Sequence, residues 1–483
     1  MKNNKLVSSW CMVGGLVIIL LVAQFLQPAD MKTQASPVET QAIYLPVVMK
    51  NHPKIYQFGV HSENYNSSIN QRAVQANNYW VRQWAFAWDL IEATPGVYDW
   101  TKVNENALRR AGQNGMQTIA VIQFAPSWAQ KYPPYACGPI AESALPAFVN
   151  FLTQLVRRYS GPPYNVKYWE VGNEPDVDRR LSGITYRHLF GCWGDQDDAY
   201  GYGGGYFAEM LKYAYPAIKA ADPGASVLIG GLLLNCDYTH TYDPPKDCSP
   251  SKFLDGILNH NGANDGANYF DIVSFHGYPT FNGSLSSDIN YPSWKHRGGV
   301  VMGKIDFLRT IMSQHGVSKP ILHTEGSLTC PEWSPTICSP PIASFYEAQA
   351  NYVVWLFIRN WATGLLGTAW FTIEGPGWRY AGLLDAQQNP KPAYYAYQYL
   401  TQKMHYAEFV REITDYSSFP VKAFEFTSPT QLIWVLWSPD EIDHMVTLPM
   451  NAQHLYDKYG VEQTLPVDKT ISVNYPVYVD LSK

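Results

Sequence analysis

The stretch Tyr168-Trp169-Glu170-Val171-Gly172-Asn173-Glu174-Pro175 decides how the rest of the chain is interpreted. It has the pattern of a buried strand that ends by presenting an Asn-Glu pair. Proline cannot donate a ladder hydrogen bond, so we expect the strand to stop before Pro175 and a loop to begin there. The glutamate at this strand end is either an ordinary turn residue or part of a site, and the motif alone does not decide between them.

A second apolar strand that ends in a glutamate supplies the missing context. The stretch Ile321-Leu322-His323-Thr324-Glu325-Gly326 places Glu325 about 150 residues after Glu174. Two carboxyl groups that flank one bond are what hydrolysis of a glycosidic bond requires. We therefore treat Glu174 and Glu325 as a candidate catalytic pair, on the condition that the fold brings their strand ends together.

Strand-like and helix-like patterns alternate through most of the chain. The clearest helix pattern has apolar residues at i, i+3, i+4, i+7, i+8 and i+11 from Phe148 to Tyr159, which marks one buried face. Strand-helix alternation implies a parallel sheet. Eight repeats over roughly 350 residues predict a closed (β/α)8 barrel with enlarged loops. The predicted strands are 56–60, 79–83, 117–123, 166–171, 226–230, 270–275, 320–324 and 367–372.

The other predicted helices and the first strand favour the barrel over an open sheet. An open doubly wound sheet is the alternative, and it normally has a glycine-rich phosphate loop after its first strand. Here the first strand leads into His61-Ser62-Glu63-Asn64 instead, so we expect no nucleotide cofactor. The other helix patterns lie at 101–114, 206–221, 253–258, 302–315, 343–361 and 392–404.

The sequence pattern changes at about His405, where the helix-like segments end. Short strand-like runs at 421–426, 432–437, 445–448 and 475–479 are separated by turns and show no helical period. This pattern predicts a small β-sandwich packed on the barrel. The expected organisation is therefore a catalytic barrel at 55–404 and a β-sandwich at 405–483, preceded by a polar linker at 29–54 and an export segment at 1–28.

The first residues predict export. Met1-Lys2-Asn3-Asn4-Lys5 precedes an uncharged run from Leu6 to Leu26, which is the order of an export signal. The run is long for a cleaved signal and just long enough to span a bilayer. A cleaved signal and an uncleaved membrane anchor both remain open, and either one predicts an extracellular or cell-surface location.

Six of the seven cysteines fall in the predicted barrel, and an even number in an exported chain indicates disulfides. Cys236 with Cys248 and Cys330 with Cys338 would close short loops, which leaves Cys137 with Cys192. Six cysteines allow 15 pairings, so other pairings stay open. Zinc is the competing interpretation, but the chain has no C-x-x-C spacing.

Composition excludes some partners and suits others. A net charge of -6 without any Lys/Arg-rich run argues against nucleic acid, whose binding needs basic patches. Aromatic residues make up 14% of the chain, with 16 Trp and 34 Tyr. Flat apolar rings suit the faces of sugar rings, although an aromatic-rich core would give the same count.

Polar and aromatic side chains gather at the predicted C-terminal strand ends, where barrel enzymes keep their sites. Strand two ends at Arg82-Gln83-Trp84, strand three runs into Ala125-Pro126-Ser127-Trp128, and strand six ends at His276-Gly277-Tyr278. Strand eight ends near Trp370, with Glu374 beyond it. A barrel with a purely structural role would not need this arrangement.

With these residues in order, the chain resembles the glycoside hydrolases of clan A over the whole barrel. Asn173-Glu174-Pro175 after strand four and Glu325 after strand seven match that clan's acid/base and nucleophile positions. The motifs at 125–128 and 169–175, together with Trp88-Asp89-Leu90-Ile91-Glu92 and Gly96-Val97-Tyr98-Asp99-Trp100, look most like family 39. That family contains β-xylosidases and α-L-iduronidases, and families 5, 30 and 51 share enough of these features to stay open.

The resemblance implies a role for each candidate residue. Glu174 would be the general acid, with a pKa raised by burial or by the second carboxylate. Glu325 would be the ionised nucleophile, about 5 Å away, which is the spacing for retention. Asn173 would bind the sugar 2-hydroxyl, and Arg82 and Tyr278 would hold Glu325 ionised and oriented. The other residues expected to bind substrate are His276 and Glu374 at the rim, with Trp84, Trp128 and Trp370 as apolar platforms.

Two other functions stay open at this point. In a non-catalytic carbohydrate-binding barrel, the two glutamates would only form hydrogen bonds with sugar. In a metal-dependent barrel hydrolase, His61, His276 and His323 at strand ends one, six and seven would be the ligands. Strand one lacks a second histidine and no bridging Lys or Asp is evident, so we expect no metal. Disulfides in the rim loops slightly favour exo action, while the sugar and linkage stay open.

Overall fold

The computed structural model describes residues 57–181, 183, 185–416 and 420–483. The predicted export segment at 1–28 and the linker at 29–54 lie outside these residues. Within the described ranges, no helix combines the length and the hydropathy that a membrane span requires.

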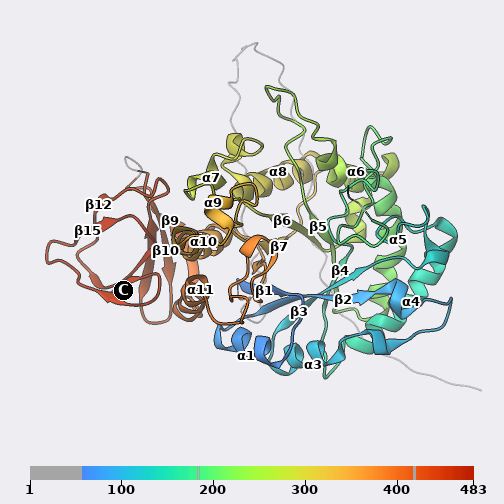
Figure 1. Ribbon diagram of the computed structural model, residues 1–483, viewed down its shortest axis with the longest axis horizontal. Helices are drawn as coiled ribbons and strands as arrows, with labels where there is room; N and C mark the ends of the chain where they lie inside the picture. Colours follow the sequence, from blue (N-terminus) through green and yellow to red (C-terminus); the bar gives the residue numbers. More distant parts are fainter. Residues whose placement is uncertain (1–56, 182, 184, 417–419) are drawn as a thin grey trace, which may run out of the picture. The chain divides into compact units, whose positions relative to one another are not determined.

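Eight parallel strands close into a barrel in the order of the sequence, from β1 next to β2 round to β8 next to β1 (Figure 1). This confirms the predicted fold class. Each predicted strand overlaps an observed one, and the ends differ by a few residues. The strands are β1 (Phe58–Ser62), β2 (Trp80–Ala87), β3 (Gln117–Gln123), β4 (Tyr168–Val171), β5 (Ser226–Leu232), β6 (Ile272–Gly277), β7 (Ile321–Gly326) and β8 (Gly367–Trp370).

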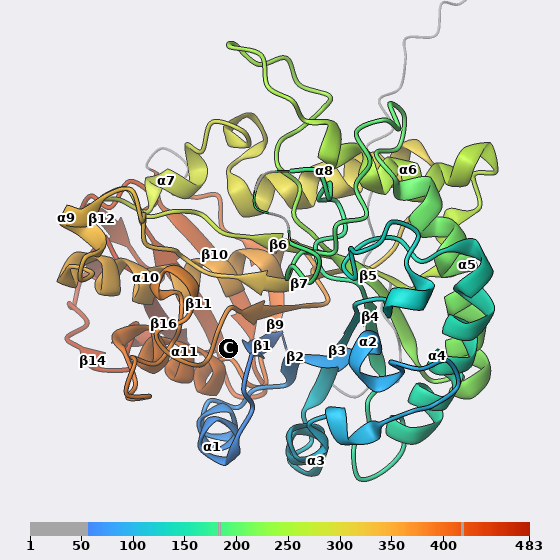
Figure 2. The ribbon, with the colours of Figure 1, turned by 45° about the vertical axis from the view of Figure 1, so that its right-hand side comes forward.

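Helices surround the strands (Figure 2). The helix predicted from the Phe148 to Tyr159 periodicity is α4, and it buries all the apolar residues of that stripe. The predicted helix 101–114 starts later, because the Asn104 side chain caps the helix by accepting a hydrogen bond from the Ala107 amide. The helices are α1 (Ser67–Gln75), α2 (Trp88–Ile91), α3 (Glu105–Gln113), α4 (Leu145–Tyr159), α5 (Gly204–Ala221), α6 (Phe253–Asn259), α7 (Ser286–Ile289), α8 (Val300–Gln314), α9 (Pro335–Cys338), α10 (Ala343–Ala362) and α11 (Pro392–Lys403).

Side chains inside the barrel form an apolar layer below a polar one. The apolar layer packs one residue from each of five strands: Trp80, Ile119, Leu228, Ile272 and Leu322. Side chains alternate across a strand, so the residue two positions further along points inward again. Three of these positions carry the buried polar residues Arg82, Ser274 and Thr324, and the other two carry Val121 and Gly230. Strand β4 adds Glu170, two residues after Tyr168. The C-terminal half of the interior is therefore polar, next to the strand ends that carry the candidate pair.

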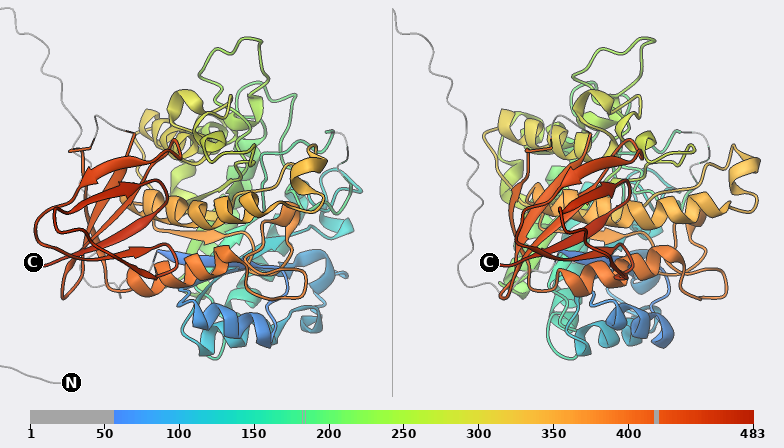
Figure 3. Two further views of the ribbon diagram at one scale, coloured as in Figure 1. Left: turned by 60° about the vertical axis from the view of Figure 1, so that its left-hand side comes forward. Right: turned by 90° about the vertical axis from the view of Figure 1, so that its left-hand side faces the viewer.

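The C-terminal part consists of two antiparallel sheets (Figure 3). A six-stranded sheet in the order β14-β13-β16-β11-β10-β9 and a two-stranded sheet of β12 and β15 enclose an apolar core that includes Trp434, Val446 and Ile471. This confirms the predicted β-sandwich, with sheets of unequal size. The strands are β9 (Glu408–Glu412), β10 (Lys422–Thr427), β11 (Leu432–Trp437), β12 (His444–Thr447), β13 (Ala452–Asp457), β14 (Glu462–Gln463), β15 (Thr470–Val473) and β16 (Val477–Leu481).

The six-stranded sheet also packs against the barrel helix α10. The indole of Trp437 stacks on Trp355 with ring centroids 5.9 Å apart, and Phe426 lies 5.0 Å from Trp361. Strand β11 alternates residues between the two cores, so this sheet is buried on both faces. The predicted division at residue 405 falls between α11 and β9, and it stays a prediction as a domain boundary because the two parts share one apolar core.

The three expected disulfides are present, and all lie in loops at the C-terminal ends of the strands. Cys137–Cys192 joins the loop after β3 to the loop after β4. Cys236–Cys248 closes the loop after β5, and Cys330–Cys338 closes the loop between β7 and α10. The pairing by sequence proximity is therefore confirmed.

Candidate active site

The fold brings the two candidate carboxylates together. Glu174 follows β4 and Glu325 lies in β7, yet one oxygen of each lies within 4.8 Å of the other and of a ring nitrogen of His276. Both glutamates are at least nine-tenths buried, with Glu174 6% and Glu325 4% exposed. The condition set by the sequence is met, because both strand ends open into the same mouth of the barrel.

Glu325 is held by a donor on each oxygen. Arg82, from β2, donates to Oε1, and the hydroxyl of Tyr278, just after β6, donates to Oε2. Burial raises the pKa of Glu325 to about 7, while Arg82 and the Tyr278 hydrogen bond oppose that rise. Charge-assisted hydrogen bonds favour the ionised form, so of the two glutamates Glu325 is the one built to carry the negative charge.

Arg82 donates hydrogen bonds to three residues of the buried polar layer and the site. Its Nη1 donates to Glu325, its Nε donates to Glu170 at 2.6 Å, and its Nη2 donates to the amide oxygen of Asn173 at 2.7 Å. Burial alone would lower the pKa of Arg82, but Glu170 and Glu325 raise it above its usual value. Loss of one partner from a buried ion pair costs about 3–5 kcal/mol because the other charge is left unpaired, so removal of Glu170 alone should destabilise the fold as well as the site.

Glu174 lies in a different environment from Glu325. Its Oε1 is 2.7 Å from Nδ1 of His276, and no arginine or lysine side chain donates to it among the described contacts. Burial raises the pKa of Glu174 well above its usual value, with Glu325 and Asp176 adding to the rise. Two carboxyl groups this close ionise one at a time. The proton of the pair therefore belongs on Glu174.

The backbone of Glu174 is held in an uncommon conformation. Its φ of 47° lies in the left-handed region, which costs a non-glycine residue roughly 1–3 kcal/mol. Its amide donates to the carbonyl oxygen of Gly231 at 3.1 Å, and this bond fixes the strained turn. Strain of this kind gathers at functional sites, and the carboxyl of this strained residue contacts His276.

His276 is neutral and tightly packed. Burial, followed by the charge of Arg82, lowers the pKa of His276 well below its usual value. Its Nε2 packs over Gly231, where an added Cβ would come within 2.0 Å of that nitrogen. A neutral ring carries one N–H, so a single proton joins Nδ1 to the Glu174 carboxyl. His276 therefore fixes the orientation of Glu174 without adding a positive charge.

The buried ammonium group of Lys304 lies close enough to Glu174 to affect its pKa. Lys304 lies on α8, is 5% exposed, and donates to the carbonyl oxygens of Leu233 at 2.6 Å and of His276 at 2.8 Å. Burial lowers the pKa of Lys304 to about 8, against the carboxylates of Asp176, Glu174 and Asp288. Its charge in turn opposes the rise in the pKa of Glu174. The titratable groups whose pKa values Lys304 lowers are Glu174, Asp176, His276 and His323.

A Lys304→Met variant is expected to move the basic limb of the pH profile of kcat/KM to higher pH. The ammonium lowers the pKa of Glu174, so its removal raises that pKa and Glu174 keeps its proton over a wider range. Lys304→Arg keeps the charge and should keep the limb in place. Lys319→Met is the matched control, because Lys319 also donates to a carbonyl oxygen, that of Phe270 just before β6. A limb that shifts equally in the Lys319 variant, or stays put in Lys304→Met, would contradict this role.

Asn173 is positioned by both ends of its amide. The amide oxygen accepts from Arg82, and Nδ2 donates to the carbonyl oxygen of Leu189 at 3.0 Å. The side chain is 3% exposed and lies beside the nucleophile through their common partner Arg82. The predicted contact with the sugar 2-hydroxyl stays a prediction, with one N–H of the amide available for it.

The prediction that Trp370 forms an aromatic platform in the site is wrong, because its side chain faces the helices. Its indole is fully buried near Tyr352 of α10, and its Nε1 donates to the carbonyl oxygen of Ala381 at 2.9 Å. Side chains alternate along a strand, so the next residue, Phe371, points into the site. The Phe371 ring lies 4.9 Å from His61 and 5.7 Å from Tyr278. A shift of one residue therefore moves the aromatic contact from Trp370 to Phe371.

Trp84 and Trp128 occupy different places. Trp84 donates from Nε1 to Nε2 of His61 at 2.7 Å, and the guanidinium of Arg82 lies 5.5 Å from its ring. It therefore borders the site. Trp128 packs edge-on against Trp88, with ring centroids 5.5 Å apart, and donates to the carbonyl oxygen of Glu92 at 3.3 Å. The described contacts do not join Trp128 to the carboxylate pair, and its platform role stays a prediction.

Glu374 clamps the loop after β8 to the end of β1. It accepts hydrogen bonds from the Ser62 hydroxyl, from the Asn64 amide at 2.9 Å and from the Thr372 hydroxyl at 2.5 Å. These bonds engage both carboxylate oxygens. Glu374 therefore holds the loop after β8 against the end of β1, and its predicted contact with substrate stays a prediction.

The three histidines of the metal alternative do not converge. His323 faces α10, where Nδ1 lies 3.0 Å from the Asn360 amide, and its ring stacks on Phe275. His61 uses Nδ1 toward Arg82 and Nε2 toward Trp84. Among the described residues, the group with ligand spacing is Glu174, His276 and Glu325. A cation there would have to compete with Arg82 for Glu325, so these residues fit an ion pair better than a metal.

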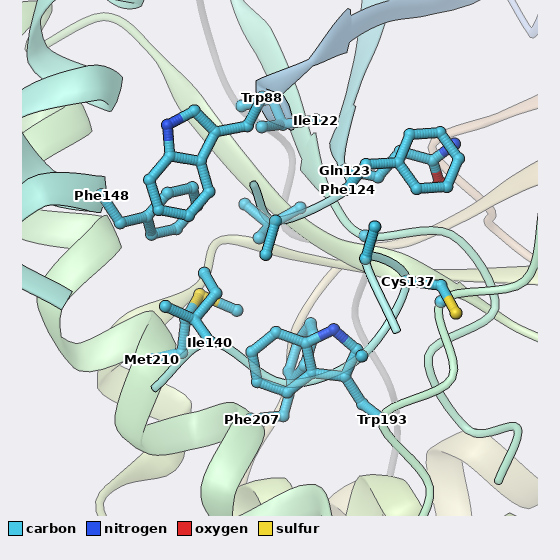
Figure 4. A pocket seen from close by; sticks show the side chains of 16 residues that line it. Trp88, Ile122, Gln123, Phe124, Cys137, Ile140, Phe148, Trp193, Phe207 and Met210 are labelled. Atoms are coloured by element: carbon cyan, nitrogen blue, oxygen red, sulfur yellow. The ribbon is translucent and has the colours of Figure 1, made fainter. Parts of the chain in front are cut away.

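An apolar pocket lies beside the site but is not the reacting centre (Figure 4). Its lining carries no carboxylate or imidazole, and it touches the site through Gly172, which precedes Asn173. Aromatic side chains dominate its walls. The lining includes Trp88, Ile122, Phe124, Phe148, Trp193, Phe207 and Met210.

Several site residues were not predicted from the sequence. Glu170 stands in the opening stretch, two positions after Tyr168, and this spacing places it inside the barrel. Lys304 lies on a helix, and a lysine in an amphipathic pattern normally points to solvent. Phe371 was missed by one position, and Trp378 lies in the loop after β8, where no periodic pattern applies.

Comparison with known proteins places this geometry in a recognised fold. No family model and no curated protein match the chain. Among solved structures, it is similar to a family 39 glycoside hydrolase from Bacteroides cellulosilyticus WH2, with a TM-score of 0.63 and 17% identity over 88% of this chain and 81% of that one. The chain has the fold of these hydrolases. The predicted resemblance is therefore confirmed at the level of the fold.

Two further structures agree. A β-xylosidase from Caulobacter crescentus CB15 has a TM-score of 0.54 and 16% identity, and the match covers 89% of this chain and 96% of that one. A family 30 endoxylanase from Clostridium papyrosolvens C71 has a TM-score of 0.55 and 10% identity, covering 89% and 97%. At these identities the likeness shows the fold, and the reaction has to be argued from the site.

Proposed function

We propose that the protein is an exported retaining glycoside hydrolase that cleaves O-glycosidic bonds by double displacement. The observation that carries the proposal is the pair Glu174 and Glu325, with oxygens within 4.8 Å of each other at one barrel mouth. Retaining enzymes keep their carboxyl groups about 5–5.5 Å apart, whereas inverting enzymes leave about 6.5–9.5 Å for a water molecule. The short separation therefore supports retention.

The unequal environments of the pair assign the two roles. Glu325, bonded to Arg82 and Tyr278, is the ionised nucleophile. Glu174, which is hydrogen-bonded to neutral His276 and has a raised pKa, is the general acid. Environments that drive two carboxyl pKa values apart are how one site obtains both functions near neutral pH.

The reaction then proceeds in two steps. The Glu325 carboxylate attacks the anomeric carbon, the bond to the leaving oxygen breaks, and that oxygen takes the proton of Glu174. The ionised Glu174 next removes a proton from water, whose oxygen attacks the anomeric carbon and releases Glu325. Asn173 would bind the 2-hydroxyl, and Phe371 replaces Trp370 as the aromatic contact near the nucleophile.

The similar solved structures and the disulfides indicate a substrate class and a location. Solved structures of similar fold are described as a β-xylosidase and a glucosidase, so aryl β-xylosides and β-glucosides are the first substrates to test. Disulfides in the rim loops and a solved structure of similar fold, described as a conserved exported protein from Bacteroides fragilis, support an extracellular or cell-surface enzyme.

Covalent labelling tests the proposal directly. Incubation with an activated 2-fluoro glycoside of each sugar should add one glycosyl group to Glu325, located by peptide mass spectrometry. The fluorine slows both steps and the good leaving group restores the first, so the glycosyl-enzyme accumulates. Sugar binding without a label at Glu325 would contradict the proposal and support a non-catalytic carbohydrate-binding barrel.

A further inference from the structure

A row of aromatic rings leads outward from the nucleophile. Tyr278, which donates to Glu325, has the Phe371 ring centroid 5.7 Å away and the Trp378 ring centroid 5.4 Å away, both edge-on. Exposure rises along the row, from 7% at Phe371 to 46% at Trp378. The row therefore joins the buried carboxylate to an aromatic ring at the surface.

The turn that presents Trp378 is strained. Trp378–Tyr380 form a short 3-10 turn after β8, in which Arg379 has φ 48° and Tyr380 has φ 59°. The left-handed region is unfavourable for a non-glycine residue, and such strain persists only where the surroundings enforce it.

Neighbouring elements enforce this turn through its carbonyl groups. The carbonyl oxygen of Arg379 accepts from the Cys330 amide at 2.9 Å, within the loop closed by Cys330–Cys338. The carbonyl oxygen of Tyr380 accepts from Lys391 at 3.0 Å and from Gln349 at 3.1 Å. The indole of Trp370 holds the next carbonyl oxygen, that of Ala381. Buried donors from four other segments thus fix one exposed turn.

The side chain of Trp378 is also held in place. The guanidinium of Arg379 lies 4.5 Å from the centre of its ring, and Arg379 in turn pairs with Glu332 at 3.4 Å. A large apolar ring that is fixed and yet nearly half exposed does not contribute its full burial energy to folding. Exposed aromatic surface joined to a polar site is typical of ligand binding.

The position of the ring indicates which part of a substrate it contacts. The leaving group lies on the side of Glu174, which protonates it. Trp378 contacts Tyr278, which binds the nucleophile Glu325. We propose that Trp378 is a specificity-determining platform for the sugar unit that becomes attached to Glu325. This inference rests on the proposed function and adds that recognition extends to the glycone side through the loop after β8.

The test measures both half-reactions in a Trp378→Ala variant. A ring that stacks on the glycone contacts it in both half-reactions, and we expect this contact to tighten as the sugar flattens in each oxocarbenium-like transition state. We expect kcat/KM for an aryl glycoside to fall about tenfold, a loss equal to about 1.4 kcal/mol of aromatic contact. The turnover of the isolated 2-fluoroglycosyl-enzyme should slow several-fold as well, and Trp378→Phe should recover most of both rates.

Trp333 provides the matched control. It lies in the Cys330–Cys338 loop and is 66% exposed, so Trp333→Ala removes an equally large surface ring and should leave both rates within twofold. Unchanged glycosyl-enzyme turnover in Trp378→Ala, with a loss of kcat/KM alone, would mean that the ring makes no contact that tightens on the glycone in the second step, and it would overturn the inference. Unchanged rates would overturn it too. Failure of the wild-type protein to form any glycosyl-enzyme would instead refute the proposed function.

Discussion

Replacing Glu325 by glutamine is expected to lower kcat by about 10⁴-fold or more, because the amide cannot form the covalent intermediate. The introduced amide keeps an oxygen that can accept from Arg82, so the geometry around the site is preserved while the nucleophile is lost. Initial rates with an aryl glycoside measure the effect. Glu209→Gln, which removes a half-buried carboxylate from α5, should stay within twofold of the wild-type protein.

The same substitution is expected to remove one pH-dependent contribution to the stability of the wild-type protein. The pKa of Glu325 is raised from 4.5 to about 7, so the folded chain binds its proton more tightly than the unfolded chain does. The wild-type protein therefore loses stability relative to Glu325→Gln as the pH rises from about 4.5 to 7. The melting temperature of the variant relative to the wild-type protein should rise over this pH window and stay constant above it. A gap that shrinks with rising pH would show that Arg82 outweighs burial.

Azide separates loss of the nucleophile from misfolding. A Glu325→Gly variant leaves a space into which azide can enter and attack the anomeric carbon directly. Because this attack replaces two displacements by one, the glycosyl azide product should have inverted configuration. A product of retained configuration would mean that another residue acts as the nucleophile.

The barrel could be predicted from the sequence because its signals are local and repeated. Each apolar run and each amphipathic segment carries its own period, so eight strands can be located without knowing their partners. Glu174 and Glu325 followed from the same logic, since parallel strands in a barrel all end at one rim. Their separation along the chain therefore did not hide them.

Other parts of the site depend on contacts that leave no local pattern. Trp370 was assigned to the wrong side because the last residue of a strand is uncertain by one position, and one position reverses the side chain. The approach of Lys304 to the carbonyl oxygens near Glu174 depends on how α8 packs. The turn at Arg379 is set by donors from distant segments, and no rule for a single segment predicts them.

Replacing Glu174 by alanine is expected to have an effect that depends on the leaving group. General acid catalysis contributes about 10²–10⁴-fold where the leaving oxygen needs a proton. A disaccharide or alkyl glycoside should therefore lose about 10³-fold in kcat/KM, whereas a dinitrophenyl glycoside, whose leaving group departs as an anion, should lose far less. A Brønsted plot of kcat/KM against leaving-group pKa should be steep for Glu174→Ala and shallow for the wild-type protein.

The pH profile and azide rescue complete the test of Glu174. Burial, Glu325 and Asp176 raise the pKa of Glu174, so its deprotonation sets the basic limb of the wild-type profile, and that limb should vanish in Glu174→Ala. Azide should restore turnover by attacking the glycosyl-enzyme from the face that Glu174 vacates. The product should then be a glycosyl azide of retained configuration, because Glu325 has already made the first displacement. If both variants gave the same azide anomer, the assignment of acid and nucleophile by their different surroundings would be wrong.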